Sequence, residues 1–391
     1  MKYEKIINNF YKKNFKKNYF VNHSPLITKS EIKEVGKCIK SSFVSTAGNY
    51  PELFKKKISK FLKAKYIVPV NSGTSALHLA MILSGLQKGD EVLMPSLTFV
   101  ATANSAIYTG ASPHFVDVKK ETLSIDFEKL NVHLSKFKFR GKYLYNHVSK
   151  KFIRALVLVH TYGYSGDVDK AKKLCKKYNL KFIEDAAESL GSYYKKKHTG
   201  TFGDFGCLSF NGNKVVTTGA GGLVILKRKS DFIKAISLAN VSKKKIPHVF
   251  DFDDIGYNYK MPSLNASFGY AQLKNLKKIL KMKNKIHLKY KFYFKKFKEI
   301  HFYSDDNILK QKSNNWLNTI LLDDKKFTKK KYIEFIKILN HKNINVRPTW
   351  KPIHKLHHLK NFHRDDLSVT NYLQYKLFNL PSSPNMIFYE K

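Results

Sequence analysis

Cysteine is scarce in this chain, which argues against two common kinds of structural site. The 391 residues include three cysteines, Cys38, Cys175 and Cys207, which lie far apart. No two of them have the CxxC spacing typical of zinc ligands or redox-active disulfides, so we expect neither a disulfide framework nor a metal site. This cysteine usage favours the reducing environment of the cytoplasm.

Long apolar runs are also missing. Apolar residues make up 43% of the chain, enough for a sizeable core. No apolar run, however, approaches the roughly 18 residues of a membrane-spanning helix. The first 20 residues are basic and aromatic, and they lack the apolar region of about 7–15 residues that a secretory signal needs. We therefore expect no membrane insertion.

Acidic residues are few, and arginine is rarer still. The chain has 72 lysines and arginines against 29 aspartates and glutamates, a net charge of +43, yet only five of the basic residues are arginines. Such a charge is compatible with binding to nucleic acid or an anionic surface. Proteins that bind phosphates or bases specifically favour the bidentate arginine side chain, and the lysines here are spread along the chain. We therefore predict no specific nucleic-acid partner and keep a basic nucleic-acid- or surface-binding protein as the non-enzymatic alternative.

Short apolar runs alternate with helical patterns over the first part of the chain. Helices are predicted at 75–86, 99–110 and 168–179. The predicted strands are 66–70, 91–95, 112–118, 155–160, 181–185, 206–210 and 222–226. Alternation of buried-looking strands with helices predicts an α/β domain around a mostly parallel sheet.

The pattern changes near residue 236, where long lysine-rich helical stretches precede an α+β-like tail. We therefore predict an N-terminal extension at 1–20, a large α/β domain at 21–235 and a smaller C-terminal domain at 236–391. The charged segment 131–152 is predicted to be a loop insertion.

Polar and aromatic residues follow two of the predicted strands, at the edge where open α/β sheets bind ligands. Thr74 and Ser75 follow the run 66–70 at the start of a helix. The N–H groups of that helix and the two hydroxyls could bind a phosphate, although such residues often serve only as helix caps. Phe99 follows the run 91–95 and either packs in the core or stacks on a ligand.

Two further strand ends carry charged residues. Asp185 and Glu188 follow one strand, where carboxylates are unfavourable unless a cation or a proton carrier pairs with them. Lys214 lies in a turn after another strand. A lysine, a carboxylate, a phosphate cradle and an aromatic face together predict pyridoxal 5'-phosphate, which binds a lysine through its aldehyde and needs an acidic partner for its ring nitrogen.

Longer stretches carry a family resemblance. They are NSGTSALHLA, GDEVLMPSLTFVATANSAIYTGASPHFVDV, VHTYG, EDAAESLGSYYKKKHTGTFGDFGCLSFNGNKVVTTGAGG and IGYNYKMPSLNASFGYAQL. Together they resemble the DegT/DnrJ/EryC1/StrS family of pyridoxal-phosphate aminotransferases, which act on nucleotide-linked keto sugars. The resemblance runs from about residue 18 to the end of the chain. It implies the fold of type I pyridoxal-phosphate transferases, similar to aspartate aminotransferase, with a large α/β domain and a smaller α+β domain.

The resemblance implies a role for each matched residue. Lys214 matches the lysine that binds the cofactor covalently, and Asp185 matches the aspartate that faces its ring nitrogen, so these two are the predicted catalytic residues. The other predicted cofactor-binding residues are Thr74, Ser75 and Ser209 at the phosphate, Phe99 on the ring, Glu188 near the 3-hydroxyl, and Asn258 reaching the phosphate from the neighbouring subunit. Asn258 thus implies a homodimer with shared active sites.

A few positions depart from the family pattern or bear on the reaction. Lys260 stands where the family usually has arginine, and Ala220 stands where glutamate or glycine is common. Relatives with histidine in place of the lysine are dehydratases, so Lys214 favours transamination. A dehydratase and an aminotransferase for another keto sugar remain the enzymatic alternatives.

Further motifs, STAGN near residue 45 and RPTW with IHKL near 350, are similar to the subgroup that makes legionaminic-acid-type 4-amino sugars. This implies a UDP- or GDP-linked 4-keto-6-deoxy-N-acetylhexosamine as substrate and L-glutamate as donor, with 2-oxoglutarate released, in bacterial surface glycan or nonulosonic acid biosynthesis. Arg347 could bind a substrate phosphate or carboxylate, Trp350 and His354 could line the sugar pocket, and His160 could touch the cofactor. A structural role stays open for each of these four residues.

Overall fold

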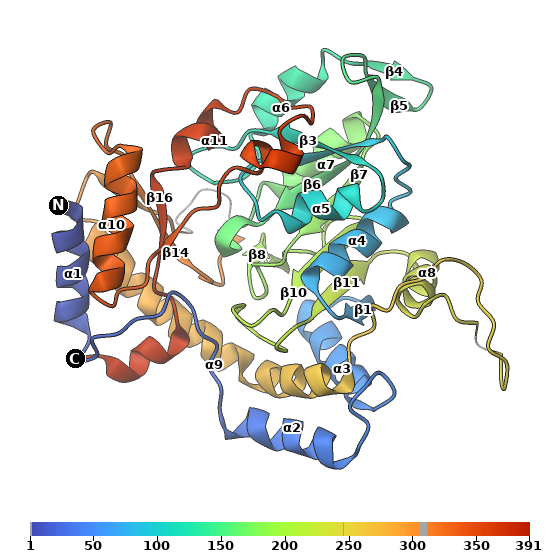
Figure 1. Cartoon of the computed structure of the whole chain (residues 1–391), viewed down its shortest axis with the longest axis horizontal. Helices are drawn as coiled ribbons and strands as arrows, with labels where there is room; N and C mark the ends of the chain where they lie inside the picture. Colours follow the sequence, from blue (N-terminus) through green and yellow to red (C-terminus); the bar gives the residue numbers. More distant parts are fainter. Residues whose placement is uncertain (1, 245, 305–310) are drawn as a thin grey trace.

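A nine-stranded mixed sheet forms the centre of the computed structural model, which describes residues 2–244, 246–304 and 311–391 (Figure 1). Its main path has the strand order β1-β11-β10-β7-β6-β2-β3, and the hairpin β4-β5 adds to β6. The strands are β1 (Tyr66–Val70), β2 (Glu91–Pro95), β3 (Ser112–Val116), β4 (Lys138–Arg140), β5 (Tyr143–Asn146), β6 (Lys151–Val159), β7 (Lys181–Asp185), β10 (Phe205–Ser209) and β11 (Gly222–Leu226).

The neighbouring strands β10, β7, β6, β2 and β3 run parallel to one another. Strand β11 is antiparallel to both β1 and β10, so β1 has the same direction as the parallel set. Strands β2, β3, β10 and β11 are buried along their whole length, as expected when helices cover both faces of a sheet. The predicted α/β domain with a mostly parallel sheet is confirmed.

Helices cover both faces of this sheet (Figure 1). Helices α4, α5 and α8 share one apolar core with the strands. Helices α3 and α9 cover the opposite face near β10 and β11, and α6 and α7 cover it near β2, β3 and β6. The helices are α1 (Lys2–Asn14), α2 (Lys29–Lys40), α3 (Tyr50–Leu62), α4 (Gly73–Leu83), α5 (Ala101–Ile107), α6 (Phe127–Leu134), α7 (Val168–Lys177), α8 (Lys229–Ala239), α9 (Ser263–Phe294), α10 (Lys329–His341) and α11 (Ser368–Leu373).

The prediction of a loop insertion at 131–152 is wrong. This segment contains the end of α6 and the antiparallel hairpin β4-β5, whose second strand pairs with β6 and so extends the main sheet. Phe137 and Leu144 are buried in the core under α6 and α7. Leu134, His133 and Asn146 are buried as well, so apolar and polar side chains together hold this segment against the sheet.

A second, antiparallel sheet of four strands lies beside the first, with the order β12-β14-β16-β15. Its core includes α10, the C-terminal half of α9 and, from the other end of the chain, α1. Phe10 of α1 stacks on Tyr290 of α9 with ring centroids 4.4 Å apart. The strands are β12 (Ile300–Phe302), β14 (Asn318–Leu322), β15 (Arg347–Pro348) and β16 (Leu377–Leu380); a third sheet has the order β13 (Gln311–Lys312), β8 (Tyr193–Tyr194) and β9 (Lys197–His198).

Helix α9 is one continuous helix of 32 residues that joins the two sheets. Its first half packs on α2 and α3, and its second half lies in the core of the second sheet. The N-terminal helix α1 packs on that same core. The domain limits at residues 20 and 235 stay predictions.

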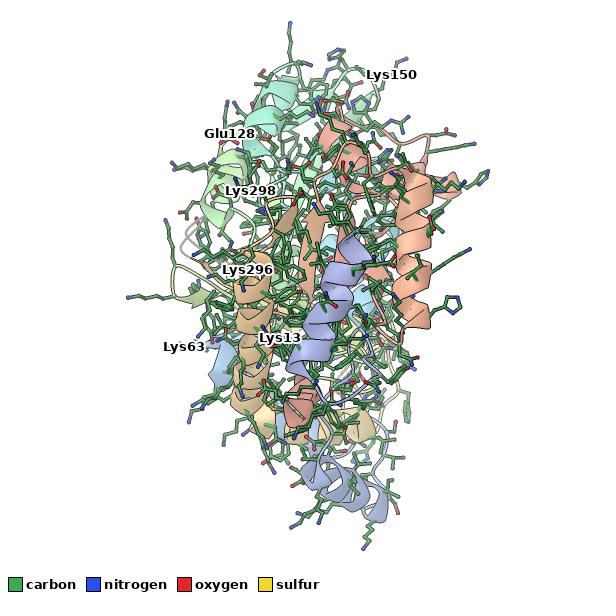
Figure 2. All side chains as sticks on the ribbon, turned by 90° about the vertical axis from the view of Figure 1, so that its left-hand side faces the viewer. Lys13, Lys63, Glu128, Lys150, Lys296 and Lys298 are labelled. Atoms are coloured by element: carbon green, nitrogen blue, oxygen red, sulfur yellow. The ribbon has the colours of Figure 1, made fainter. Side chains whose placement is uncertain are left out.

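The lysines are spread over separate elements. Figure 2 labels Lys13 on α1, Lys63 after α3, Lys150 near β6, and Lys296 and Lys298 after α9, and all five are exposed. In residues 2–244, 246–304 and 311–391, no helix has both the length and the apolar character that crossing a bilayer requires.

Candidate active site

A cavity of about 420 Å³ opens beyond the carboxyl ends of β1, β2, β7 and β10. These strands share a direction, so their ends meet at one edge of the sheet. Part of the wall comes from the second sheet, through Arg347 and Pro348 of β15, and from Trp316 and Trp350. Six of the eight predicted site residues line this cavity: Thr74, Phe99, Asp185, Glu188, Ser209 and Lys214.

One end of the cavity is formed by the N-terminus of α4. Ser72 caps this helix, and its Oγ accepts a hydrogen bond from the Ser75 N–H at 3.0 Å. Gly73 lies against the end of β10, where a Cβ on Gly73 would come within 2.8 Å of the Ser209 Cβ. Only glycine therefore allows Ser209 to lie beside the first turn of α4. Free N–H groups of that turn and the hydroxyls of Thr74 and Ser209 form an anion cradle.

Ser75 differs from its predicted placement, because it does not line the cavity. Its buried hydroxyl donates to Asn71 Oδ1 at 2.6 Å and lies 2.8 Å from Ser72 Oγ. Ser72, which the sequence reasoning left out, lines the cavity instead. The preference for serine as a helix cap is the signal that could have found it.

Asp185 ends β7, next to the end of β10 in the sheet. Its buried carboxylate accepts a hydrogen bond from Thr102 Oγ1 at 2.8 Å and another from the Ala187 N–H at 3.2 Å. Burial nevertheless raises the pKa of Asp185 above its ordinary value. Its charge is therefore only partly compensated, and a protonated ring nitrogen in the cavity would supply the missing partner.

Lys214 lies in the turn after β10, with its side chain 14% exposed. Its Nζ is 3.5 Å from Glu188 Oε1 and 4.1 Å from the ring centroid of Trp316. The Trp316 Nε1–H donates to the Asn213 carbonyl at 2.8 Å and so fixes the turn that carries the lysine. The amine is held by a long ion pair and an aromatic face, which leaves it able to react with an aldehyde.

Glu188 faces Lys214 from the segment after β7. Its Oε2 accepts a hydrogen bond from the Tyr162 N–H at 2.8 Å, and Tyr162 has a positive φ of 56° that points this N–H at the carboxylate. Burial raises the pKa of Glu188 from 4.5 to about 7, against the opposing effect of the Lys214 charge. Glu188 thus changes its charge near neutral pH.

The raised pKa of Glu188 makes a stability prediction for the cofactor-free protein. Consider a carboxyl group whose pKa is higher in the folded than in the unfolded protein. Its contribution to stability is fully present when the pH lies below the unfolded pKa, and it is lost as the pH rises through the folded pKa. Between pH 4.5 and 7 the loss is roughly 3 kcal/mol. Glu188→Gln should therefore become more stable relative to the unsubstituted protein as the pH rises from 5 to 8, as measured by urea unfolding. A stability difference independent of pH would contradict the raised pKa.

These residues fit pyridoxal phosphate. The anion cradle suits its phosphate, the carboxylate of Asp185 suits its ring nitrogen, and the amine of Lys214 suits its aldehyde. Phe99 lines the cavity with 55% of its surface exposed, which leaves a face free to stack on the ring.

The other candidate residues divide into two groups. Arg347 and Trp350 line the cavity, and Trp350 packs on Tyr162 with ring centroids 4.6 Å apart. His354 and His160 do not line it. His354 Nδ1 lies 2.6 Å from Ser96 Oγ, and burial lowers the pKa of His354 to about 4.

His160 is buried beneath the strand ends. Its Nε2 lies 2.9 Å from Glu184 Oε2, and its Nδ1 accepts a hydrogen bond from the Gly166 N–H. Both ring nitrogens thus have partners within the protein, which agrees with a structural role for His160.

Asn258 is exposed and does not line the cavity of this single chain; its carbonyl accepts a hydrogen bond from the side chain of Asn71. Its role in a second subunit stays a prediction.

The sequence reasoning missed three residues that position the predicted groups: Trp316, Tyr162 and Thr102. Thr102 of α5 lies four residues after Thr98, and the two hydroxyls are 3.1 Å apart; this spacing could have drawn attention to Thr102. Tyr162 lies in the motif VHTYG, but nothing in the sequence predicts the positive φ that points its N–H at Glu188. Trp316 lies just before β14 of the second sheet, about 100 residues after Lys214, so nothing near Lys214 in the sequence points to it.

Known proteins resemble this chain along nearly its whole length. It matches the model of the DegT/DnrJ/EryC1/StrS aminotransferase family over residues 25–388. It is 32% identical to GDP-perosamine synthase of Escherichia coli O157:H7 over 94% of each chain. It is also 32% identical to the UDP-4-amino-4,6-dideoxy-N-acetyl-beta-L-altrosamine transaminase of Campylobacter jejuni, over 88% of this chain and 90% of that one.

A solved structure supports the same assignment. Helicobacter pylori PseC, an aminotransferase involved in the biosynthesis of pseudoaminic acid, matches with a TM-score of 0.83 and 27% identity, over 94% of each chain. The predicted fold class, enzyme class and cofactor are confirmed. The chain therefore belongs to the DegT/DnrJ/EryC1/StrS family and is a pyridoxal-phosphate-dependent sugar aminotransferase of fold type I.

Proposed function

We propose that the enzyme transfers the amino group of L-glutamate to C4 of a UDP- or GDP-linked 4-keto-6-deoxy-N-acetylhexosamine, for bacterial surface glycan or nonulosonic acid biosynthesis of the legionaminic-acid type. The observation that carries this proposal is the convergence of Lys214 and Asp185, from the ends of two adjacent strands, on one cavity. The relative from Campylobacter jejuni is named for a UDP-linked 4-amino-4,6-dideoxy-N-acetyl sugar, and the relative from Escherichia coli is named for GDP-perosamine. Because both relatives are 32% identical to this chain, their names support a UDP-linked and a GDP-linked substrate equally.

Each residue of the site has a task in this reaction. Pyridoxal phosphate, when bound, supplies the aldehyde that takes up the amino group and the ring that withdraws electrons. Lys214 Nζ removes the proton from the α-carbon of glutamate and returns protons to the sugar carbon in the second half of the reaction. The carboxylate of Asp185 keeps a proton on the ring nitrogen. Thr74, Ser209 and the first turn of α4 hold the phosphate.

A homodimer completes the proposed site. Asn258 follows a segment with several exposed apolar side chains, among them Phe250 at 81% and Ile255 at 79% exposure. Contiguous exposed apolar side chains mark protein interfaces. Covering this segment with a second copy of the chain would bring Asn258 to the partner's phosphate cradle.

Arg347 is proposed to bind an anionic group of one substrate. It lines the cavity from β15, and within the described part of the chain it makes no ion pair. Arg347→Lys keeps the charge but loses the bidentate geometry. We expect the KM of the substrate that Arg347 binds to rise roughly 10- to 100-fold, the effect of losing a charged hydrogen bond of about 1.5–3 kcal/mol.

The two half-reactions identify which substrate Arg347 binds. If it binds the α-carboxylate of glutamate, only the rate with glutamate changes; if it binds a sugar-nucleotide phosphate, only the rate with the keto sugar changes. Unchanged kinetics in both half-reactions would remove Arg347 from the binding site. Arg154, which lies on β6 and does not line the cavity, is the control.

An absorption spectrum tests the proposed function. The purified enzyme should absorb in the near-visible, and glutamate should bleach this band. UDP- and GDP-linked 4-keto sugars are then compared by how fast each restores the band, and the product of the faster one is examined for nitrogen at C4. Restoration by neither sugar class would refute the proposed substrate. A product that has lost a hydroxyl without gaining nitrogen would favour the dehydratase.

A further inference from the structure

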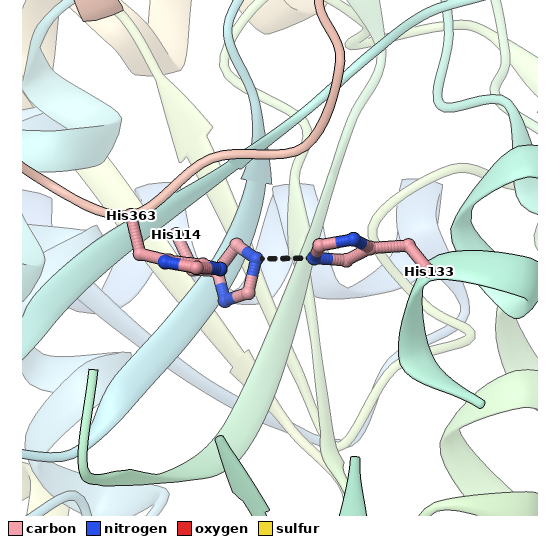
Figure 3. Close-up of side chains that lie close together, drawn as sticks. All are labelled: His114, His133 and His363. Carbon is pink, nitrogen blue, oxygen red and sulfur yellow. Dashed lines mark hydrogen bonds between the residues drawn. The ribbon is translucent and has the colours of Figure 1, made fainter. Parts of the chain in front are cut away.

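Three histidines from distant parts of the chain meet at the edge of the main sheet, outside the cavity. His114 lies on β3, His133 on α6, and His363 in the segment before α11. One ring nitrogen of each lies within 4.8 Å of the others (Figure 3). None of the three lines the active-site cavity. The active site therefore does not involve this cluster.

The hydrogen bonds of two of these rings fix where their protons lie. His114 Nδ1 is 2.9 Å from Glu91 Oε2, and His133 Nδ1 is 3.2 Å from Asp365 Oδ1. Asn146 Nδ2 also donates to Glu91 Oε2 at 3.0 Å, so this carboxylate oxygen accepts from both side chains. A carboxylate only accepts hydrogen bonds, so each Nδ1 carries a proton.

The remaining nitrogens then face one another. His114 Nε2 and His133 Nε2 are 2.9 Å apart, as the dashed line in Figure 3 marks. With both Nδ1 atoms protonated, each neutral ring has a lone pair on Nε2, and two lone pairs at this distance repel. A positive charge between them, from a proton or a metal ion, would relieve the repulsion. His363 offers a further nitrogen beside this pair.

We propose that His114, His133 and His363 bind one divalent transition-metal ion, with the chemistry of Zn²⁺. Zinc accepts three imidazole nitrogens at about 2.0–2.1 Å with a water as fourth ligand, which places ligand atoms about 3.4 Å apart. The distance of 2.9 Å between the Nε2 atoms of His114 and His133 and the upper limit of 4.8 Å for all three ligand atoms lie on either side of this value. Nitrogen-only ligands disfavour calcium and magnesium, which take oxygen.

The surroundings match those of metal sites in one further respect. Ligand histidines usually donate their second ring N–H to a carboxylate, which orients the ring, and Glu91 and Asp365 occupy these positions.

The bound ion would have a structural task. The segment around His363 pairs with β3: the Phe115 N–H donates to the His363 carbonyl at 2.9 Å, and the Asp365 N–H donates to the Phe115 carbonyl at 3.0 Å. This segment follows Trp350, which lines the active-site cavity. The ion would thus fasten the chain behind Trp350 to the main sheet and to α6.

Metal titration of the untagged holoenzyme tests this proposal. After removal of metals with a chelator, we expect ZnCl₂ to bind with one ion per chain in calorimetry and to raise the melting temperature. CoCl₂ should give the visible absorption of a tetrahedral cobalt site. His363→Ala, which removes a half-exposed ring, should abolish stoichiometric binding and the rise in melting temperature.

Two more variants sharpen the result. Asp365→Asn should weaken zinc binding about 10- to 100-fold, as loss of an orienting carboxylate does. His358→Ala removes an exposed histidine of the same segment and should leave binding unchanged. Circular dichroism and the cofactor spectrum confirm that each variant is folded.

Two outcomes would overturn the proposal. Failure of the unsubstituted holoenzyme to bind zinc stoichiometrically would show that the three rings form a hydrogen-bonded cluster that shares a proton. Equal zinc binding by His363→Ala would place the ion elsewhere. Neither outcome bears on the aminotransferase activity, which the glutamate half-reaction reports separately.

Discussion

Replacing Lys214 by alanine is expected to lower the rate of transamination by at least about 1,000-fold, within the range for removal of a group that moves protons during the reaction. The variant loses the amine that we propose binds the cofactor aldehyde and acts as the base at the substrate carbon. The anion cradle and Asp185 remain, so it should still bind pyridoxal phosphate without a covalent bond. Single-turnover absorbance changes with glutamate measure the loss, and the spectrum of the bound cofactor shows whether the covalent link is gone.

Two matched variants separate chemistry from packing. Lys214→Arg keeps a cation near Glu188 and Trp316 but cannot form the covalent link, so it should be as inactive as Lys214→Ala. Lys260→Ala is the control: it removes a lysine that lies two residues after Asn258 and does not line the cavity, so this variant should retain most of the activity. Turnover by Lys214→Ala within tenfold of the unsubstituted enzyme would refute the role of Lys214.

Much of the site could be predicted because its residues lie at strand ends. The run before each of Thr74, Phe99, Asp185 and Lys214 is apolar and short, and the strands in the structure fall within a few residues of their predicted limits. In a parallel sheet the carboxyl ends of the strands meet at one edge, so local patterns sufficed to place distant residues together. The functional roles of these residues remain for the substitutions to test.

Residues that act through tertiary contacts could not be found in this way. Trp316 packs on Lys214 from a segment about 100 residues away, and its pairing depends on how the second sheet lies against the first. The cluster of His114, His133 and His363 was even harder to predict from the sequence. Metal motifs are recognised by short ligand spacings, and here one ligand is separated from the other two by most of the chain.

The error at 131–152 has a related cause. Lysines and other polar residues dominate this segment, and composition alone predicts a solvated loop. Backbone pairing between β5 and β6, with Leu134, Phe137 and Leu144 in the core beneath, is enough to order it as a hairpin. Edge strands expose one side, so their sequences carry little of the apolar alternation on which strand prediction depends.

Asp185→Asn is expected to reduce kcat by roughly 100- to 1,000-fold, the range for loss of one preorganised electrostatic contact in a buried site. Asparagine preserves the size of the side chain and can still accept the hydrogen bond from Thr102. Its neutral amide, however, cannot stabilise a proton on the ring nitrogen, so the ring withdraws electrons less well. Lys214 is untouched, and the covalent link to the cofactor should form normally. Rapid mixing with glutamate, followed by absorbance, measures the loss in the first half-reaction.

Thr102→Val tests the same contact from the other side. The hydrogen bond from Thr102 lowers the pKa of Asp185, which burial raises. Its removal should raise this pKa further while leaving the carboxylate in place. The activity of Thr102→Val should therefore fall off at a higher pH on the acid side, with kcat near that of the unsubstituted enzyme at high pH. Asp185→Asn should instead remain slow at every pH, because no carboxylate is left to ionise. If Asp185→Asn kept a kcat within tenfold of the unsubstituted enzyme, the buried carboxylate would be structural, and the protonation of the ring nitrogen would have to depend on another group.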